Sequence, residues 1–148
     1  MRNVNQKIIL TLNVPSVEAT AAWYERVLGW VGHFDTFDEG GCCLFGSVMR
    51  RDTPELCFNL SRSDKIEEGE WCRHSSTWVY VEDVDAVYNR VLVQGWPIES
   101  EIANYFWGER QFRIRDIYGN ELVFVQPIEE LGLEEIRERH RQIHQEGS

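Results

Sequence analysis

Short segments in which apolar and polar residues alternate predict a protein built largely of β-strands. In residues 8–14, Leu10, Leu12 and Val14 share one face, which is the pattern of a half-buried strand. The same alternation recurs in residues 76–81. Further strands are expected where β-prone segments lie between turn-forming residues, at 30–37, 42–49, 55–61, 97–103, 110–116 and 121–126.

Two segments have the features of α-helices. Ser16 is a favourable N-cap for a helix over residues 19–28, and Gly29 stops that helix. Asp83 precedes a second helix over residues 84–94, which also ends at a glycine. Each helix follows one alternating strand and precedes three more strands, so the chain reads βαβββ twice and is predicted to be an α+β protein.

The two βαβββ halves are related by an internal repeat. Residues 14–19 (VPSVEA) match residues 81–86 (VEDVDA) at a shift of 67 positions. Residues 55–58 (ELCF) match residues 121–124 (ELVF) at a shift of 66 positions. We therefore predict a single duplicated domain over residues 1–148. Its expected parts are a first module at about 8–61, a connector at 62–75, a second module at about 76–127 and a helical tail at 128–148.

The charge of the chain limits its partners. With 15 lysines and arginines against 25 aspartates and glutamates, the 148-residue chain has a formal net charge of −10. Such a balance argues against nucleic acid and against an anionic membrane surface as partners. It suits a cationic ligand, but it also keeps a protein soluble, and solubility alone is the simpler interpretation.

The features that report on the cellular compartment favour the cytoplasm. The apolar run at residues 8–14 is too short for a signal peptide or for a membrane span. The cysteines form no CxxC pair, so neither a zinc knuckle nor a thioredoxin-type site is indicated, and reduced thiols are expected. The four cysteines are Cys42, Cys43, Cys57 and Cys72.

The tail at residues 128–148 has the charge pattern of a solvated helix. Glutamates and arginines recur at spacings of three and four residues, which pairs opposite charges along one face. His140 and His144 are also four residues apart, the spacing of a two-histidine metal clip. Because no third ligand accompanies them, a surface helix without metal is the favoured interpretation.

Two segments resemble the vicinal oxygen chelate superfamily, which includes glyoxalase, extradiol dioxygenases and bleomycin resistance proteins. They are residues 14–30 (VPSVEATAAWYERVLGW) and residues 107–127 (WGERQFRIRDIYGNELVFVQP). With the duplicated βαβββ pattern, the resemblance extends over nearly the whole chain. It implies two modules whose curved sheets form a cup, and metal ligands on the first and last strands of each module.

The positions at which the resemblance places metal ligands do not carry metal-binding residues. They are occupied by Ile9, Cys57, Ser76 and Val123. Two of these side chains have no donor atom, so the usual site for a divalent ion cannot form, and we expect no metal and no cofactor. A shifted site would have to use His33, His74, Glu55 or Glu121, which are more typical of surface or satisfied polar positions.

Without a metal, the chemistry of the expected cup lies in its lining. Strand alternation predicts that amide, hydroxyl, thiol, guanidinium and aromatic groups face the cup, and two aromatic residues, Tyr105 and Trp107, lie in the loop before the strand at 110–116. Such a lining suits a planar or peptide-like small molecule. The predicted ligand-binding residues are Thr11, Asn13, Cys57, Asn59, Trp78, Tyr80, Tyr105, Trp107 and Arg113.

Two functions from different classes follow. The first is a metal-free binding protein that sequesters an antibiotic or other natural product, because the resemblance implies homodimers that bind a cationic antibiotic. The second is a lyase, isomerase or dioxygenase with displaced ligands, or a metal-independent catalyst that uses Glu55, Glu121, Tyr80 or Cys57. No nucleophile is predicted beside a base, so we name no catalytic residue and favour binding. A scaffold role for the tail helix is a third alternative.

Overall fold

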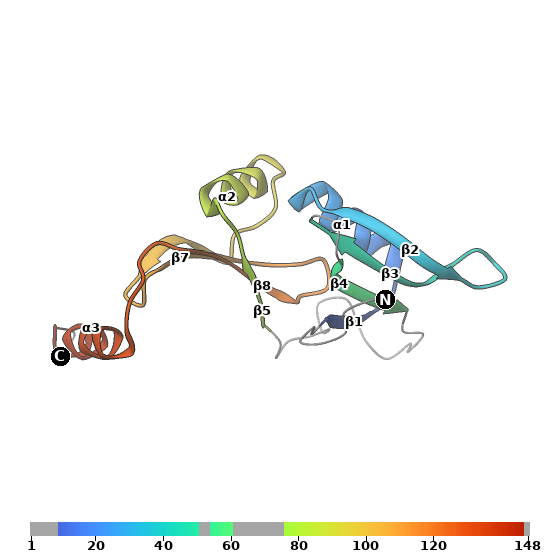
Figure 1. Cartoon of the computed structure of the whole chain (residues 1–148). Helices are drawn as coiled ribbons and strands as arrows, with labels where there is room; N and C mark the ends of the chain where they lie inside the picture. Colours follow the sequence, from blue (N-terminus) through green and yellow to red (C-terminus); the bar gives the residue numbers. More distant parts are fainter. Residues whose placement is uncertain (1–8, 51–53, 61–75, 147–148) are drawn as a thin grey trace. The chain divides into compact units, whose positions relative to one another are not determined.

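The computed structural model contains two four-stranded mixed sheets and three helices in its described residues, which confirms the α+β prediction (Figure 1). The described residues are 9–50, 54–60 and 76–146. The predicted connector at 62–75 lies outside them. The chain divides into two compact units, Met1–Trp71 with Asp116–Gly119 and Cys72–Arg115 with Asn120–Ser148.

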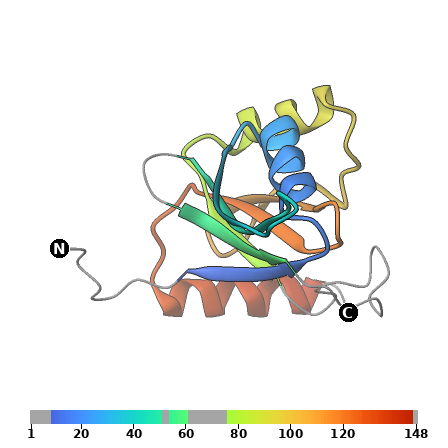
Figure 2. The same cartoon turned by 90° about the vertical axis from the view of Figure 1, so that its right-hand side faces the viewer.

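The first unit holds a sheet covered by one helix. Its elements are β1 (Leu10–Val14), α1 (Val17–Leu28), β2 (Val31–Phe37), β3 (Cys43–Met49) and β4 (Pro54–Leu60). The strand order is β1-β4-β3-β2, with β1 parallel to β4 and the other pairs antiparallel. Helix α1 lies along one face of this sheet, as Figure 1 and Figure 2 both show.

The second unit repeats that order and adds a C-terminal helix. Its elements are β5 (Ser76–Tyr80), α2 (Val84–Val93), β6 (Ser100–Tyr105), β7 (Glu109–Arg115), β8 (Glu121–Pro127) and α3 (Leu133–Glu146). The strand order β5-β8-β7-β6 matches that of the first sheet, with β5 parallel to β8. The predicted repeat of βαβββ is therefore present in the topology.

The helix starts follow the predicted capping residues. The Ser16 hydroxyl accepts a hydrogen bond from the backbone N–H of Ala19 at 3.1 Å, and the Asp83 carboxylate does the same for Ala86 at 3.1 Å. Each bond satisfies one of the donors that a helix start leaves without a partner. Gly29 ends α1 in the left-handed conformation, with φ of 76°. The caps thus place each helix directly after its strand.

The predicted strand at 97–103 differs from β6, which begins at Ser100. Pro97 has no N–H group for a strand ladder, so regular pairing starts after it. The pairing with β7 is also irregular between Ser100 and Ala103, where the register shifts. Alternation in this segment therefore predicted a strand but not its correct position.

The core of the first unit forms where α1 meets the sheet. The buried ring of Tyr24 packs against Phe58 with the centroids 5.6 Å apart and against Trp30 at 5.5 Å. Gly46 allows the close approach, because a Cβ at this position would lie 2.8 Å from the carbonyl oxygen of His33 and 2.9 Å from Val17. The apolar face that alternation predicted is the face against the helix.

The core of the second unit fixes which face of its sheet α2 covers. Phe112 is fully buried, stacks on Phe124 with the centroids 5.1 Å apart, and meets the edge of Tyr88 from α2 at 5.1 Å. On the same face, Arg110 pairs with Asp85 of α2 at 2.9 Å. Because strand side chains alternate, the neighbours of Phe112 on β7 point to the other face.

The tail forms α3, and none of its side chains is buried. Arg139 attaches the helix to its own unit, because its guanidinium donates to Glu129 at 2.6 Å and to the backbone oxygen of Phe106 at 3.3 Å. The predicted charge pairs are present at the expected spacings, for example between Arg137 and Glu134 at 2.8 Å. Among the described residues, no helix is both long enough and apolar enough to cross a membrane.

Candidate functional site

The second sheet has an aromatic face, turned away from α2, which carries Trp78, Tyr80, Glu109, Gln111 and Arg113. The register sets Trp78 beside Val123 and Arg113, and it sets Tyr80 beside Val125 and Gln111. Residues two apart on a strand share a face, so the β7 residues line up along this surface. Three of the predicted ligand-binding residues, Trp78, Tyr80 and Arg113, therefore lie together.

The two aromatic side chains of β5 are exposed on this face. Trp78 retains 44% and Tyr80 retains 53% of its accessible surface. Val79, between them in sequence, is buried on the opposite face. Large aromatic rings left in solvent on neighbouring positions of one strand are typical of ligand contact or of an interface.

A carboxylate lies at the centre of a hydrogen-bond cluster on the aromatic face. Oε1 of Glu109 accepts bonds from Nε1 of Trp107 at 2.7 Å and from Nε2 of Gln111 at 3.2 Å. The Tyr80 hydroxyl also donates to this carboxylate. Trp107 stacks on Tyr105 with the ring centroids 4.6 Å apart. The predicted aromatic pair before the hairpin thus belongs to the same cluster.

The Tyr80 hydroxyl is held in its protonated form by this environment. Burial raises the pKa of Tyr80, and the neighbouring negative charge of Glu109 and the hydrogen bond to it raise the pKa further. An ionised phenol beside a carboxylate would place two like charges together. Tyr80 is therefore a hydrogen-bond donor and not a general base at neutral pH.

Replacing Glu109 with glutamine should lower the pKa of Tyr80 toward its ordinary value of about 10. A raised pKa in the folded state means that the folded protein holds this proton more tightly than the unfolded chain. The associated stability is complete below the ordinary pKa and is lost as the pH rises through the folded-state pKa. Absorbance titration of tyrosinate measures the shift, and the Tyr80→Phe variant identifies the signal. A titration curve that Glu109→Gln leaves unchanged would contradict the contact.

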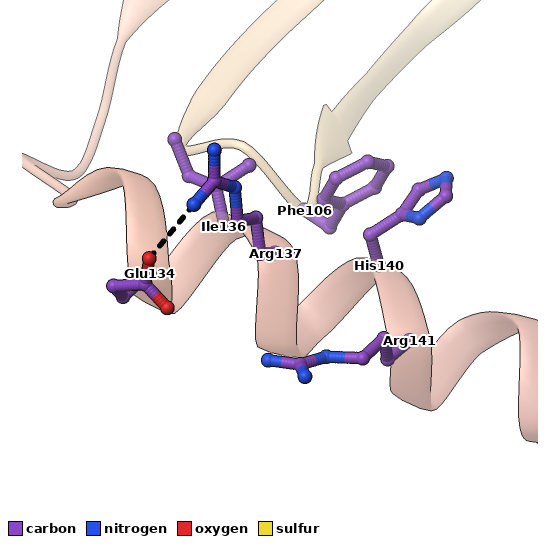
Figure 3. Close-up of a pocket in the computed structure, with 6 residues that line it drawn as sticks. All are labelled: Phe106, Glu134, Ile136, Arg137, His140 and Arg141. Atoms are coloured by element: carbon purple, nitrogen blue, oxygen red, sulfur yellow. Dashed lines mark hydrogen bonds and ion pairs between the residues drawn. The ribbon is translucent and has the colours of Figure 1, made fainter.

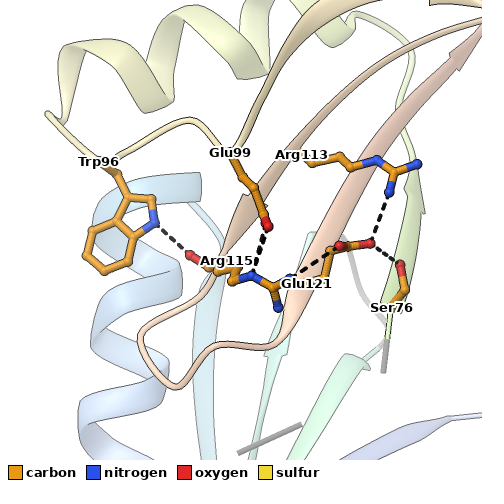
Figure 4. Close-up of polar contacts among 6 residues, drawn as sticks. All are labelled: Ser76, Trp96, Glu99, Arg113, Arg115 and Glu121. Atoms are coloured by element: carbon orange, nitrogen blue, oxygen red, sulfur yellow. Dashed lines mark hydrogen bonds and ion pairs between the residues drawn. The ribbon is translucent and has the colours of Figure 1, made fainter. Parts of the chain in front are cut away.

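Glu121 is held in a separate polar network at the start of β5 and β8 (Figure 4). It accepts a hydrogen bond from the Ser76 hydroxyl at 2.7 Å, and it pairs with Arg113 at 3.4 Å and Arg115 at 3.6 Å. Arg115 also pairs with Glu99 at 3.1 Å. These contacts use the Glu121 carboxylate within the protein, so it is a poor candidate for the shifted metal ligand or the general base considered above.

The residues at the four positions where the superfamily places metal ligands are not suited to hold a metal ion. Val123 is fully buried and Ile9 is exposed, and neither side chain has a donor atom. The Ser76 hydroxyl donates to Glu121, while Cys57 is buried. A divalent ion with imidazole and carboxylate ligands is therefore incompatible with this donor set.

The other candidate metal ligands do not converge. Within the described ranges, no group of three or more histidine, cysteine, aspartate and glutamate side chains is arranged to hold a metal ion. Nε2 of His33 pairs with Asp35 at 2.9 Å on an exposed strand. His74 and the side chain of Glu55 lie outside the described residues. In α3, the Nε2 atoms of His140 and His144 are 2.9 Å apart.

The remaining predicted binding residues lie in the first unit. Thr11 and Asn13 are exposed on β1, and Asn59 is exposed on β4. Cys57 is buried between Thr11 and Ser47 in the register of the sheet. These four residues alternate along their strands with the buried side chains of Leu12, Val14, Leu56 and Phe58, and their role in binding stays a prediction.

A groove of about 620 Å³ lies beside α3, and none of the predicted binding residues is among the residues that line it (Figure 3). Its lining residues are Phe106, Glu134, Ile136, Arg137, His140 and Arg141. The Phe106 ring lies 5.4 Å from that of His140, and Glu134 and Arg137 pair with each other. The volume is sufficient for a small ligand, but five of the six lining residues belong to α3, a helix without buried residues. We therefore place the candidate site on the aromatic face.

Glu109 and Gln111 are site residues that the sequence prediction missed. The available signal was the alternation of β7, because residues 109, 111 and 113 must share a face once Arg113 is assigned to it. The bond from Trp107 to Glu109 was not predictable, since it depends on how the loop before β7 turns its side chains.

Comparison with known proteins identifies the family. The model of the Glyoxalase/Bleomycin resistance protein/Dioxygenase superfamily matches residues 8–124, and the chain belongs to this superfamily. An uncharacterised protein of Mycobacterium bovis is 27% identical over 93 residues. That match covers 63% of this chain and 59% of the relative, so the chain spans little more than half of the relative's length.

Solved structures share the fold. A glyoxalase-related enzyme from Clostridium phytofermentans is 25% identical with a TM-score of 0.66, and the match covers 86% of this chain and all of that one. TnmS3, an antibiotic-binding protein from a Streptomyces species, is 19% identical with a TM-score of 0.63, and the match covers 86% of this chain and 99% of TnmS3. The second likeness is one of fold alone.

Proposed function

We propose that this protein is a metal-free small-molecule binding protein that sequesters an antibiotic or another natural product on the aromatic face. The observation that carries the proposal is the pair of exposed aromatic side chains, Trp78 and Tyr80, beside a cluster of hydrogen-bonding groups. Flat rings next to a few polar groups favour a planar ligand. The antibiotic-binding activity in the name of TnmS3, which shares this fold, supports the proposal.

The polar groups of the face support binding more than catalysis. Tyr80 is held protonated, and the Glu121 carboxylate is already paired with Arg113 and Arg115. A catalytic base needs a free acceptor near the reacting proton. Sequestration needs only an affinity of about 1 μM or better, which corresponds to about 8 kcal/mol. Assembly as a homodimer, which the superfamily resemblance implies, and a cytoplasmic location, which the sequence features favour, are part of the proposal.

Replacing Trp78 with alanine should weaken the binding of a planar ligand about tenfold, because stacking and apolar burial on one large ring contribute roughly 1–2 kcal/mol. Isothermal titration with acridine and with a panel of planar and peptide antibiotics measures the effect. Val93→Ala is the matched control, since Val93 is 82% exposed on α2, which covers the opposite face. It should leave the affinity unchanged.

Two results would contradict the proposal. If none of the planar compounds binds the wild-type protein, the aromatic face is not a ligand site. If the protein instead turns over hemithioacetals, catechols or epoxides when a divalent metal is added, it is an enzyme of the superfamily, the second function considered from the sequence.

A further inference from the structure

The Glu109 carboxylate is surrounded by donors that leave its charge in place. The groups that bond it are the indole of Trp107 at 2.7 Å, the amide of Gln111 at 3.2 Å and the hydroxyl of Tyr80. All three are neutral, so they orient the carboxylate without cancelling its negative charge. A fixed, oriented anion of this kind is suited to a cationic partner.

The two arginines of β7 that are nearest to Glu109 in sequence are engaged elsewhere. Arg110 points to the opposite face and pairs with Asp85 at 2.9 Å. Arg113 shares the aromatic face but pairs with Glu121 at 3.4 Å. Neither arginine therefore supplies the positive charge that would complement Glu109.

A second acceptor beside Glu109 lacks a donor. Gln111 is fully buried, and its Oε1 atom has no hydrogen-bond partner among the described residues. Buried polar atoms in folded proteins are nearly always satisfied, so an orphan acceptor points to a donor that is missing from the structure. Its position next to a carboxylate favours a donor that carries positive charge.

The surrounding rings favour the same chemistry. Tyr105 and Trp107 form a stack with the centroids 4.6 Å apart, and the Tyr80 ring is half exposed at the carboxylate. Aromatic faces attract cations and also stack on planar ligands. The ring arrangement is therefore compatible with a ligand that is both flat and positively charged.

We propose that Glu109 recognises a protonated amine or amidine group on a planar ligand, with the Gln111 oxygen as a second acceptor for its N–H groups. This inference rests on the proposed function, because it assigns the charge of the ligand that the aromatic face binds. It also gives the net charge of −10 a specific role, since an acidic surface speeds the capture of a cation.

The test compares two planar probes of similar shape. At neutral pH, 9-aminoacridine is a cation with N–H donors, whereas acridine is neutral. The wild-type protein should bind 9-aminoacridine about tenfold more tightly or better, as expected for hydrogen bonds to a charged group. Glu109→Gln should reduce this preference to within about twofold while leaving the affinity for acridine unchanged.

Two controls test whether the effect of Glu109→Gln comes from the charge at this position, from a change in folding or from the net charge of the protein. Glutamine keeps an oxygen that accepts from Trp107, so Glu109→Gln should retain the wild-type unfolding midpoint. Glu101→Gln removes one exposed carboxylate from β6 of the same sheet and should keep the preference for the cation. Equal loss in both variants would assign the preference to net charge and overturn the role of Glu109.

The outcomes also separate this inference from the proposed function. If both probes bind equally to the wild-type protein and Trp78→Ala weakens both, the aromatic face binds ligands and the role of Glu109 is refuted. If neither probe binds, the proposed function fails and the inference fails with it.

Discussion

Replacing Phe112 with alanine should reduce the free energy of unfolding by about 3–5 kcal/mol, which is the usual loss for a buried phenylalanine in a well-packed core. Phe112 is fully buried, stacks on Phe124 and contacts Tyr88 of α2. Alanine would leave a cavity at the place where the helix meets the sheet. Urea unfolding followed by circular dichroism measures the loss.

The graded control is Phe112→Leu, which keeps most of the buried volume and should cost clearly less than alanine. Val93→Ala, at an exposed position of α2, should change the free energy of unfolding by less than about 0.5 kcal/mol. A loss below about 1 kcal/mol for Phe112→Ala would mean that α2 does not pack on this face in the folded protein. The aromatic face would then no longer be defined as the opposite face.

The strands and helices could largely be predicted from the sequence because their causes are local. Alternation placed Leu12 and Val14 on the buried face of β1, and a single serine fixed the start of α1. Because the second half of the chain repeats the pattern of the first, the same features predicted the strands and the helix of the second βαβββ module. The start of β6 was misplaced because Pro97 interrupts strand pairing without interrupting the apolar pattern.

The aromatic face could be predicted only in part. Trp78 and Tyr80 share a face because side chains alternate along a strand. The position of Arg113 on the same face follows from the pairing of β7 with β8. The contact from Tyr80 to Glu109 joins side chains from β5 and β7, which are separated by β8 in the sheet. Such contacts depend on side-chain length and rotamer, which a pattern of apolar and polar positions does not encode.

The hairpin turn between β7 and β8 shows how one segment serves two purposes. Residues 116–120 contain a glycine and an asparagine, which favour a tight reversal between two strands. Gly119 has φ of 84°, as such a turn requires, and Oδ1 of Asp116 accepts from the backbone N–H of Tyr118 at 3.0 Å. The other oxygen of Asp116 accepts a hydrogen bond from the Tyr24 hydroxyl at 2.8 Å. This contact lies within the first unit and joins two residues that are 92 positions apart in sequence.

Replacing Asp116 with alanine should therefore reduce the free energy of unfolding by about 2–4 kcal/mol, because it removes a buried charged acceptor that serves two donors. Asp116 is 4% exposed and Tyr24 is fully buried, so water cannot readily replace the carboxylate. Asp116→Asn keeps a carbonyl oxygen in the same place and should cost less than alanine. Thermal and urea unfolding of both variants measure the difference.

Tyr24→Phe removes the donor and leaves the turn bond from Tyr118 in place, so it should cost only about 0.5–1.5 kcal/mol. The expected order of losses is thus Asp116→Ala, then Asp116→Asn, then Tyr24→Phe. If alanine at position 116 costs less than phenylalanine at position 24, the carboxylate is not the shared acceptor. A near-zero cost for all three substitutions would mean that the turn does not contact α1. The backbone of the hairpin alone would then hold the conformation of the turn.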